Sequence, residues 1–146
     1  DKNRQDQRAT AETLSTLAAA CLHTGRPDEA GKALIEARTL YQDQDNDSGL
    51  ADTVGHLGLV CTMQDNLEEA KALLLEAVRL NDALGRQVHL ADNYGNLGNV
   101  CWTMGRHADA EKYYHRALSI FEHAESPARA AKTRDLLRGL LAVQSA

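Results

Sequence analysis

The sequence predicts an all-α fold, an α-solenoid of stacked antiparallel helix hairpins with three repeats and a C-terminal capping helix. Two observations predict it. Apolar residues recur at a fixed step of 40 residues, as in Leu17, Leu57 and Leu97. Within each step, the apolar positions follow the three-and-four spacing of two amphipathic helices. One such hairpin cannot bury its own apolar face, so the hairpins are expected to stack.

The 40-residue register continues along the chain without an insertion. Further sets at the same step are Cys21, Cys61 and Cys101, then Ala30, Ala70 and Ala110, then Ala37, Ala77 and Ala117. The register places repeats at about 7–46, 47–86 and 87–126 and a capping helix at about 127–143, within one domain that spans 1–146. At least about three stacked units are needed for a stable core, which this count satisfies.

Turn residues divide each repeat into two helices. Gly25 and Gly105 are expected to end first helices in the left-handed conformation, and Gln64-Asp65-Asn66 breaks the second repeat. Pro27 suits the first turn of a helix, and Ser126-Pro127 opens the capping helix.

Leucine and glycine positions predict how the paired helices pack. Leu17, Leu57 and Leu97 are expected to fill the hairpin cores, where truncation to alanine costs about 2–5 kcal/mol. Gly58 and Gly98 are expected at the closest approach of the two helices, where a larger side chain overpacks the contact.

The two ends of the repeat array differ in polarity. The last helix carries Arg134 and Arg138 at the positions of Tyr94 and Gly98, so it is expected to be a polar cap. The start has no such cap, and Leu14 and Leu22 are expected to be partly exposed there, facing an upstream repeat or another subunit.

Composition narrows the class of partner. The chain is 43% hydrophobic and 25% charged, a soluble globular profile, and its net charge of −5 disfavours nucleic acid and anionic membranes as partners. No stretch approaches the roughly 18 apolar residues of a membrane helix. The first seven residues lack an apolar core, so no signal peptide is expected.

The third repeat carries a known signature. Its residues Tyr94, Leu97, Gly98 and Cys101, followed by Ala110, Tyr114 and Ala117, follow the order of the pattern W-x2-L-G-x2-Y, A-x3-F, A. The chain therefore resembles the tetratricopeptide repeat family over nearly its whole length. The family repeat has 34 residues, and Gln42, Asp82 and Glu122 replace its closing proline. The six extra residues are expected to lengthen the helices and the turn between repeats.

The 40-residue form resembles the repeats of kinesin light chains and of the Leu-Gly-Asn repeat proteins. Asn96-Leu97-Gly98-Asn99 looks like the motif that names the latter, although the other two repeats lack it. The same long form is common in bacterial regulators.

The resemblance implies that the first helices line a concave peptide-binding groove. The candidate binding residues are the first-helix positions that packing does not use: Asn96, Asn99, Trp102, His56, Asp92, Asp52, Leu59, Met63, Thr103, Lys132 and Leu136. Asparagine can donate and accept hydrogen bonds toward a peptide backbone, and tryptophan offers a flat apolar anchor. Asp52 and Asp92 favour a peptide with basic residues. Histidine at 23 and 56 is a candidate source of pH-sensitive binding.

Some family members grip a carboxy-terminal carboxylate with basic residues on their first helices. Those positions here hold Ser15, Ala19, His56, Asp92 and Asn96, so a carboxylate clamp is not expected.

Metal and redox chemistry are not predicted. Stacked repeats lie about 10 Å apart, beyond the reach of a disulfide at about 7 Å, so the three cysteines are expected to be buried structural thiols in a reducing, cytoplasmic compartment. His107, Glu111 and His115 span about 12 Å of helix, too far for one ion to meet all three. We expect them on a solvated surface, with no metal and no cofactor.

The sequence contains no nucleophile elbow, phosphate loop, dinucleotide fingerprint or HExxH motif, so no enzyme is predicted. The predicted function is a protein–protein interaction scaffold that binds a peptide or partner protein in the concave groove. Two alternatives remain open: a self-assembly (homo-oligomerisation) module, and the regulatory arm of a larger sensor protein.

Overall fold

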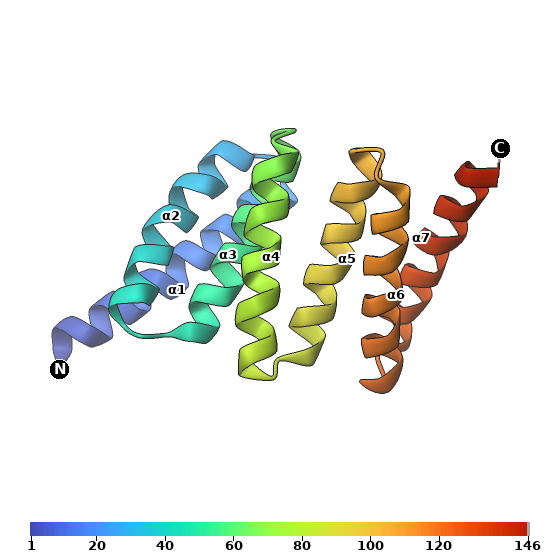
Figure 1. Ribbon diagram of the computed structural model, residues 1–146. Helices are drawn as coiled ribbons and strands as arrows, with labels where there is room; N and C mark the ends of the chain where they lie inside the picture. The colour runs from blue at the N-terminus through green and yellow to red at the C-terminus, as the bar shows by residue number, and fades with distance from the viewer. Residues whose placement is uncertain (146) are drawn as a thin grey trace. The chain divides into compact units, whose positions relative to one another are not determined.

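Residues 1–145, which the computed structural model describes, form seven α-helices joined by short turns (Figure 1). The helices are α1 (Lys2–His23), α2 (Pro27–Asp43), α3 (Asp47–Met63), α4 (Leu67–Leu84), α5 (Gln87–Thr103), α6 (His107–His123) and α7 (Pro127–Ser145). They pair in the order that the register predicted, and α7 begins at the predicted proline. The all-α class and the hairpin repeats are confirmed.

The six turns share one geometry. A residue with positive φ follows each helix, at Gly25, Asp45, Asp65, Gly85, Gly105 and Glu125, a spacing of half a repeat. The next N–H donates to the carbonyl five residues earlier, as from Arg26 to Cys21 at 2.8 Å. This closure ends the helices sharply. Turns within and between repeats are equally short, so the additional residues of the long repeat lie in the helices and do not lengthen the turn between repeats.

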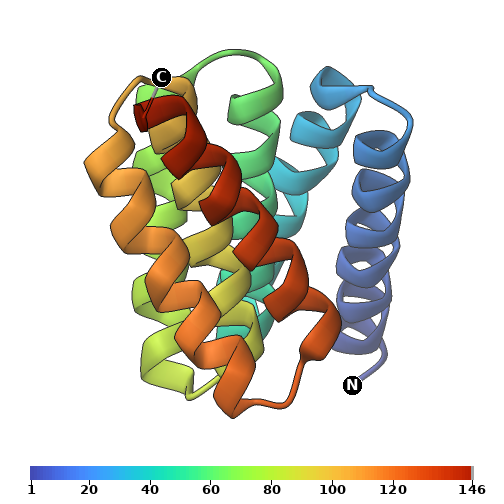
Figure 2. The same cartoon turned by 90° about the vertical axis from the view of Figure 1, so that its right-hand side faces the viewer.

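The chain divides into two compact units, one spanning Asp1–Leu80 and the other beginning at Asn81. The first unit contains α1, α2, α3 and most of α4. The second contains the end of α4 with α5, α6 and α7, which pack as neighbours in Figures 1 and 2. The single-domain boundary of 1–146 stays a prediction.

In the first unit, α3 packs on the hairpin of α1 and α2. Its Leu57 and Val60 join a buried cluster with Ala18 and Cys21 of α1, Ala30, Ala33 and Leu34 of α2. The alanines let the three helices approach closely enough for the leucines to interlock. Leu14 and Leu22 are partly exposed, as we expected, and the rest of each side chain packs against this cluster.

The prediction that Leu17 fills a hairpin core is wrong. Its side chain is 51% exposed, whereas Leu57 is 6% and Leu97 is 0% exposed at the same repeat position. Leu57 is buried because it packs against the preceding hairpin. Leu17 lies on the first helix of the described chain and, among residues 1–145, has no preceding hairpin to pack against.

In the second unit, the core lies between α5, α6 and α7. Cys101, Ala110, Tyr114, Leu137 and Leu140 form its buried centre. The exposed side of α7 carries the two predicted arginines of the cap. Arg134 lies 3.8 Å from Glu122, and Arg138 lies 3.3 Å from Asp135. These contacts agree with a polar cap.

Candidate functional site

The candidate residues of the second unit lie on α5 and α7. Asp92, Asn96, Asn99 and Thr103 follow one another at helical spacings of four, three and four residues, which align side chains along one stripe. Lys132 and Leu136 occupy the same repeat positions on α7 as Asp92 and Asn96 on α5. We call these six residues with Trp102 the α5–α7 face.

Two asparagines lie at the middle of the α5–α7 face. Asn96 is half-buried, and its side-chain amide makes no hydrogen bond to any other described residue. Asn99 is exposed, and its Oδ1 accepts a hydrogen bond from the hydroxyl of the buried Tyr114 of α6. The amide of Asn96 therefore remains available to a ligand, whereas the oxygen of Asn99 already supports the core.

Trp102 lies where the α5–α7 face borders the core of the second unit. It is partly buried and meets the Tyr114 ring edge to face at a centroid distance of 6.3 Å. Its far ring edge lies against Gly139 of α7, where an added Cβ would stand 3.2 Å from the ring. Leu136 packs into the same cluster. Part of the predicted apolar anchor is thus used within the protein, and only its remaining surface can contact a ligand.

Charge on the α5–α7 face is partly paired. Arg129 of α7 donates from Nε to Oδ1 of Asp92 at 3.2 Å, so a basic ligand residue would compete with Arg129 for this carboxylate. Lys132 is exposed one helical turn further along α7. Thr103 is exposed, and its hydroxyl donates to the Asn99 carbonyl at 3.0 Å, an ordinary bond within the helix.

The candidate residues of the first unit lie on α3. Asp52, His56, Leu59 and Met63 repeat the same helical stripe, and we call them the α3 face. Asp52, His56 and Leu59 are half-buried, and Met63 is 45% exposed. This set is more apolar than the α5–α7 face, because leucine and methionine take the positions of Asn99 and Thr103.

Burial lowers the pKa of His56 below its ordinary value of 6.5, and the carboxylate of Asp52 offsets part of this effect. Because the folded pKa lies below the unfolded one, the unfolded chain takes up the proton first as pH falls. The stability from neutral His56 is therefore present above the unfolded pKa and is lost as pH falls toward the folded pKa. Between about pH 7.5 and about pH 5, urea unfolding should show a larger loss for wild type than for His56→Gln. Equal losses would contradict this assignment.

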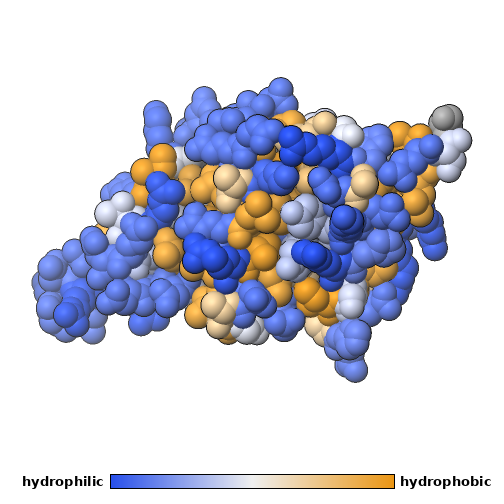
Figure 3. All heavy atoms as spheres, in the orientation of Figure 1, coloured by the Kyte–Doolittle hydropathy of each residue, from blue (hydrophilic) through white to orange (hydrophobic). Residues whose placement is uncertain are grey.

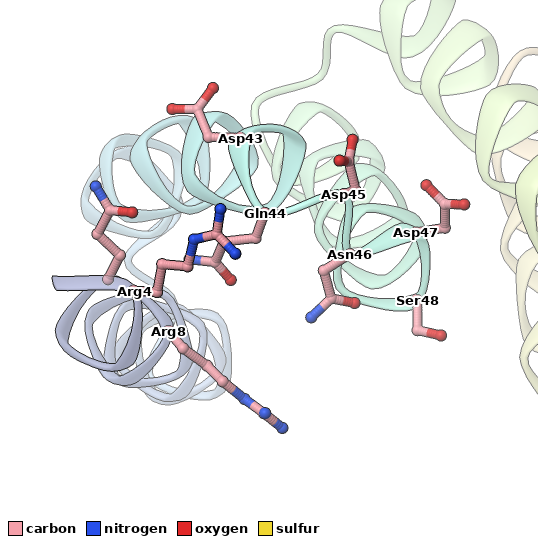
Figure 4. A pocket seen from close by; sticks show the side chains of 9 residues that line it. Arg4, Arg8, Asp43, Gln44, Asp45, Asn46, Asp47 and Ser48 are labelled. Carbon is pink, nitrogen blue, oxygen red and sulfur yellow. The ribbon is translucent and has the colours of Figure 1, made fainter. Parts of the chain in front are cut away.

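A polar cleft of about 660 Å³ lies in the first unit, and none of the α3-face residues lines it. Arg4 of α1 extends toward Gln44, whereas the Arg8 side chain points away from the turn that carries Asp45 and Asn46 (Figure 4) and pairs with Glu12. Asn46 accepts from the Gly49 N–H at 2.9 Å and so caps α3. Because the cleft mixes cations and carboxylates, no single ligand charge is favoured. Sequence reasoning did not anticipate this cleft, since it depends on α1 lying beside the turn between α2 and α3.

The metal-ligating residue types are dispersed over the described chain. In residues 1–145 no group of three or more histidine, cysteine, aspartate or glutamate side chains is arranged to hold a metal ion. Glu111 and His115 form an exposed pair at 3.7 Å. All three cysteines are buried, which confirms their predicted placement. Burial, assisted by the nearby Glu69, raises the pKa of the Cys61 thiol and keeps it protonated.

Sequence reasoning missed two residues that shape the α5–α7 face. Arg129 neutralises Asp92, and Tyr114 occupies the Asn99 oxygen. Tyr114 appeared in the sequence only as a core position, and no spacing rule linked its hydroxyl to Asn99. Arg129 lies 37 residues from Asp92, so only the packing of α7 on α5 reveals the contact.

Comparison with known proteins identifies the repeat. The tetratricopeptide repeat profile matches residues 9–83 and, overlapping them, residues 50–123. No curated protein sequence matches the chain.

Three solved structures illustrate the likeness. The tetratricopeptide domain of Arabidopsis FLU matches 80% of this chain and 98% of its own, with a TM-score of 0.75 and 15% identity. A Rap protein complexed with Competence and Sporulation Factor gives 0.86 at 20% identity, covering 92% of this chain and 38% of the Rap chain. MamA gives 0.62 at 24% identity, covering 92% and 80%. These identities establish a shared fold only, and the kinesin light chain subtype stays a prediction.

Within residues 1–145, no helix has the length and apolar character that a bilayer crossing requires.

Proposed function

Because the chain belongs to the tetratricopeptide repeat family, whose stacked hairpins form surfaces for protein–protein interaction, we propose that its first helices bind an extended peptide of a partner protein. Members of this family are typically interaction scaffolds rather than enzymes. One of the similar structures is a Rap protein in complex with Competence and Sporulation Factor, which supports ligand binding by this fold.

The observation that carries the proposal is the Asn96 amide. It is half-buried on the α5–α7 face and makes no hydrogen bond to other described residues. An extended peptide backbone presents both an N–H and a carbonyl, and the amide of Asn96 can pair with both. The Asn96 amide atoms are not among the buried side-chain atoms that lack a partner, so water reaches them, and a ligand that pairs with both gains the net strength of two hydrogen bonds.

The surroundings of Asn96 suggest which peptide fits. The exposed part of Trp102 and the side chain of Leu136, which pack against the core of the second unit, supply the apolar surface of the α5–α7 face. Asp92 is already paired with Arg129, so charge contributes less than the sequence suggested. We propose a peptide with an apolar side chain beside its hydrogen-bonding backbone. A basic residue would add affinity by competing for Asp92 or by meeting Asp52 on the α3 face.

Asn96→Ala should weaken peptide binding without destabilising the fold. Peptides selected from a random displayed library on the wild-type chain provide the ligand, and calorimetry measures their affinity. Losing two hydrogen bonds of about 0.7 kcal/mol each raises Kd by about tenfold. Gln42→Ala removes an exposed amide from α2 and is the matched control.

Two results would count against the proposal: equal affinity of wild type and Asn96→Ala, or an equal loss in Gln42→Ala. Asn99→Ala is a poorer probe, because it also removes the hydrogen bond to Tyr114 and is expected to lower stability by about 1 kcal/mol. A role as the regulatory arm of a larger sensor protein is compatible with this binding and remains a further proposal.

A further inference from the structure

A second hollow lies on the second helices of the first unit. It is an open groove of about 320 Å³ between α2 and α4, with α3 as its floor. We call it the α2–α4 groove; its lining includes Gly31 and Ile35 of α2, Leu57 and Val60 of α3, and Leu73 of α4. The volume is at the small end for a ligand pocket and the groove is open, so it suits side chains of another protein better than a free small molecule.

An apolar side chain reaches the surface at this groove. Ile35 of α2, which is one of the lining residues, is 54% exposed. Figure 3 shows apolar atoms over α4 and between α4 and α2, bordered by hydrophilic side chains. A cluster of this kind with a polar border is typical of a protein interaction site.

The α2–α4 groove is separate from the α3 face. At 100° per residue, Leu57, Val60 and Cys61 lie on a different side of α3 from Asp52, His56 and Met63. Occupation of the groove therefore leaves the proposed peptide-binding positions uncovered.

The charged side chains that line the groove differ along its length. Where the helices begin the lining is acidic, with Asp28 on α2 and Glu69 on α4. Further along α2 the lining is basic, with Lys32 and Arg38. The lining is therefore acidic where the helices begin and basic further along α2.

We propose that the α2–α4 groove binds the same groove of a second copy of this chain, in a two-fold antiparallel arrangement. A two-fold axis across the groove reverses the helix direction, so the acidic end of one copy meets the basic end of the other. Ile35, midway along α2, then lies near the axis and packs against its counterpart. A uniformly acidic or basic peptide would oppose like charges at one end, whereas a second copy does not.

The area fits a weak dimer. An α2 of 17 residues is about 25 Å long, and two neighbouring helices are about 20 Å wide, which gives about 500 Å² on each copy. A buried total of about 1,000 Å² is at the lower limit of specific interfaces. The dimer should therefore form in the micromolar range and exchange readily.

Sedimentation velocity of the whole chain from about 1 μM to about 1 mM tests the proposal. Wild type should shift from monomer toward dimer, and Ile35→Glu should remain monomeric because it places a charge near the axis. Val143→Glu changes an apolar residue of α7 that is 51% exposed and does not line the groove, and it should dimerise like wild type. Both positions are exposed, and a thermal melt by circular dichroism verifies folding.

Charge reversal separates this arrangement from any other dimer. Lys32→Glu with Arg38→Glu makes one variant's groove acidic, and Asp28→Lys with Glu69→Lys makes another's basic. Each folded variant alone should dimerise at least tenfold more weakly than wild type, and an equimolar mixture should recover association. Monomeric wild type at all concentrations, or a mixture that stays monomeric, overturns the proposal. Peptide binding by the other faces is measured independently, so either proposal can fail alone.

Discussion

Truncating Leu97 to alanine should lower the free energy of unfolding by about 2–5 kcal/mol, whereas truncating Leu17 should change it by less than about 0.5 kcal/mol. Both leucines occupy the same position in the 40-residue repeat. Leu97 is 0% exposed and Leu17 is 51% exposed, so only the first truncation leaves a cavity. The difference between the two losses of unfolding free energy therefore measures how much the contribution of this repeat position depends on a helix that packs over it.

Urea unfolding monitored by circular dichroism gives the two free energies. Leu57→Ala should resemble Leu97→Ala, because Leu57 is 6% exposed within the core of the first unit. A loss of several kcal/mol in Leu17→Ala would show that another segment covers α1 in solution. Such a loss, if it depended on protein concentration, would identify the cover as another copy of the chain.

Gly98→Ala should destabilise the second unit by about 1–3 kcal/mol, whereas Gly95→Ala should stabilise it by about 0.5–1 kcal/mol. A Cβ added at Gly98 would stand 2.5 Å from the Tyr114 ring, which is fully buried. The ring cannot easily withdraw, because its hydroxyl is held by Asn99. A Cβ at Gly95 meets nothing within 4 Å, so only the better helix propensity of alanine remains.

Both glycines lie on α5, so thermal melts of the two single variants compare one substitution in two environments of one helix. Equal effects would mean that helix propensity alone decides and that the contact between Gly98 and Tyr114 is loose. In a Tyr114→Phe background the ring is no longer held by Asn99, so Gly98→Ala should lower the stability by less there than in wild type.

Much of the fold followed from local spacing. The 40-residue step located every repeat, and glycine or aspartate marked five of the six turns at the residue that adopts positive φ. These features depend on residues that are close in sequence, so they can be predicted from the sequence alone. The candidate faces followed from the same step, because it assigns each first-helix residue to a packed or an unpacked position.

Side-chain partners across helices did not follow from spacing. Asn81 stands at the repeat position of Tyr41 and Phe121, yet it is 1% exposed and donates to Asn93 Oδ1 at 2.7 Å. Arg86 completes this contact by donating to Asn81 Oδ1 at 3.1 Å. The 40-residue step did not reveal this polar pair, because it compares equivalent positions and does not identify contacts between helices.

By itself, the sequence determined the helices, their pairing and the faces they present, because helix period and turn chemistry act over a few residues. The tertiary structure alone decided which of those faces is available. It exposed Leu17, engaged Asn99 with Tyr114 and Asp92 with Arg129, and left Ile35 beside an uncovered groove. Burial and pairing depend on the helix that packs against each position. The repeat pattern is the same in every unit, so it does not show which helix that is.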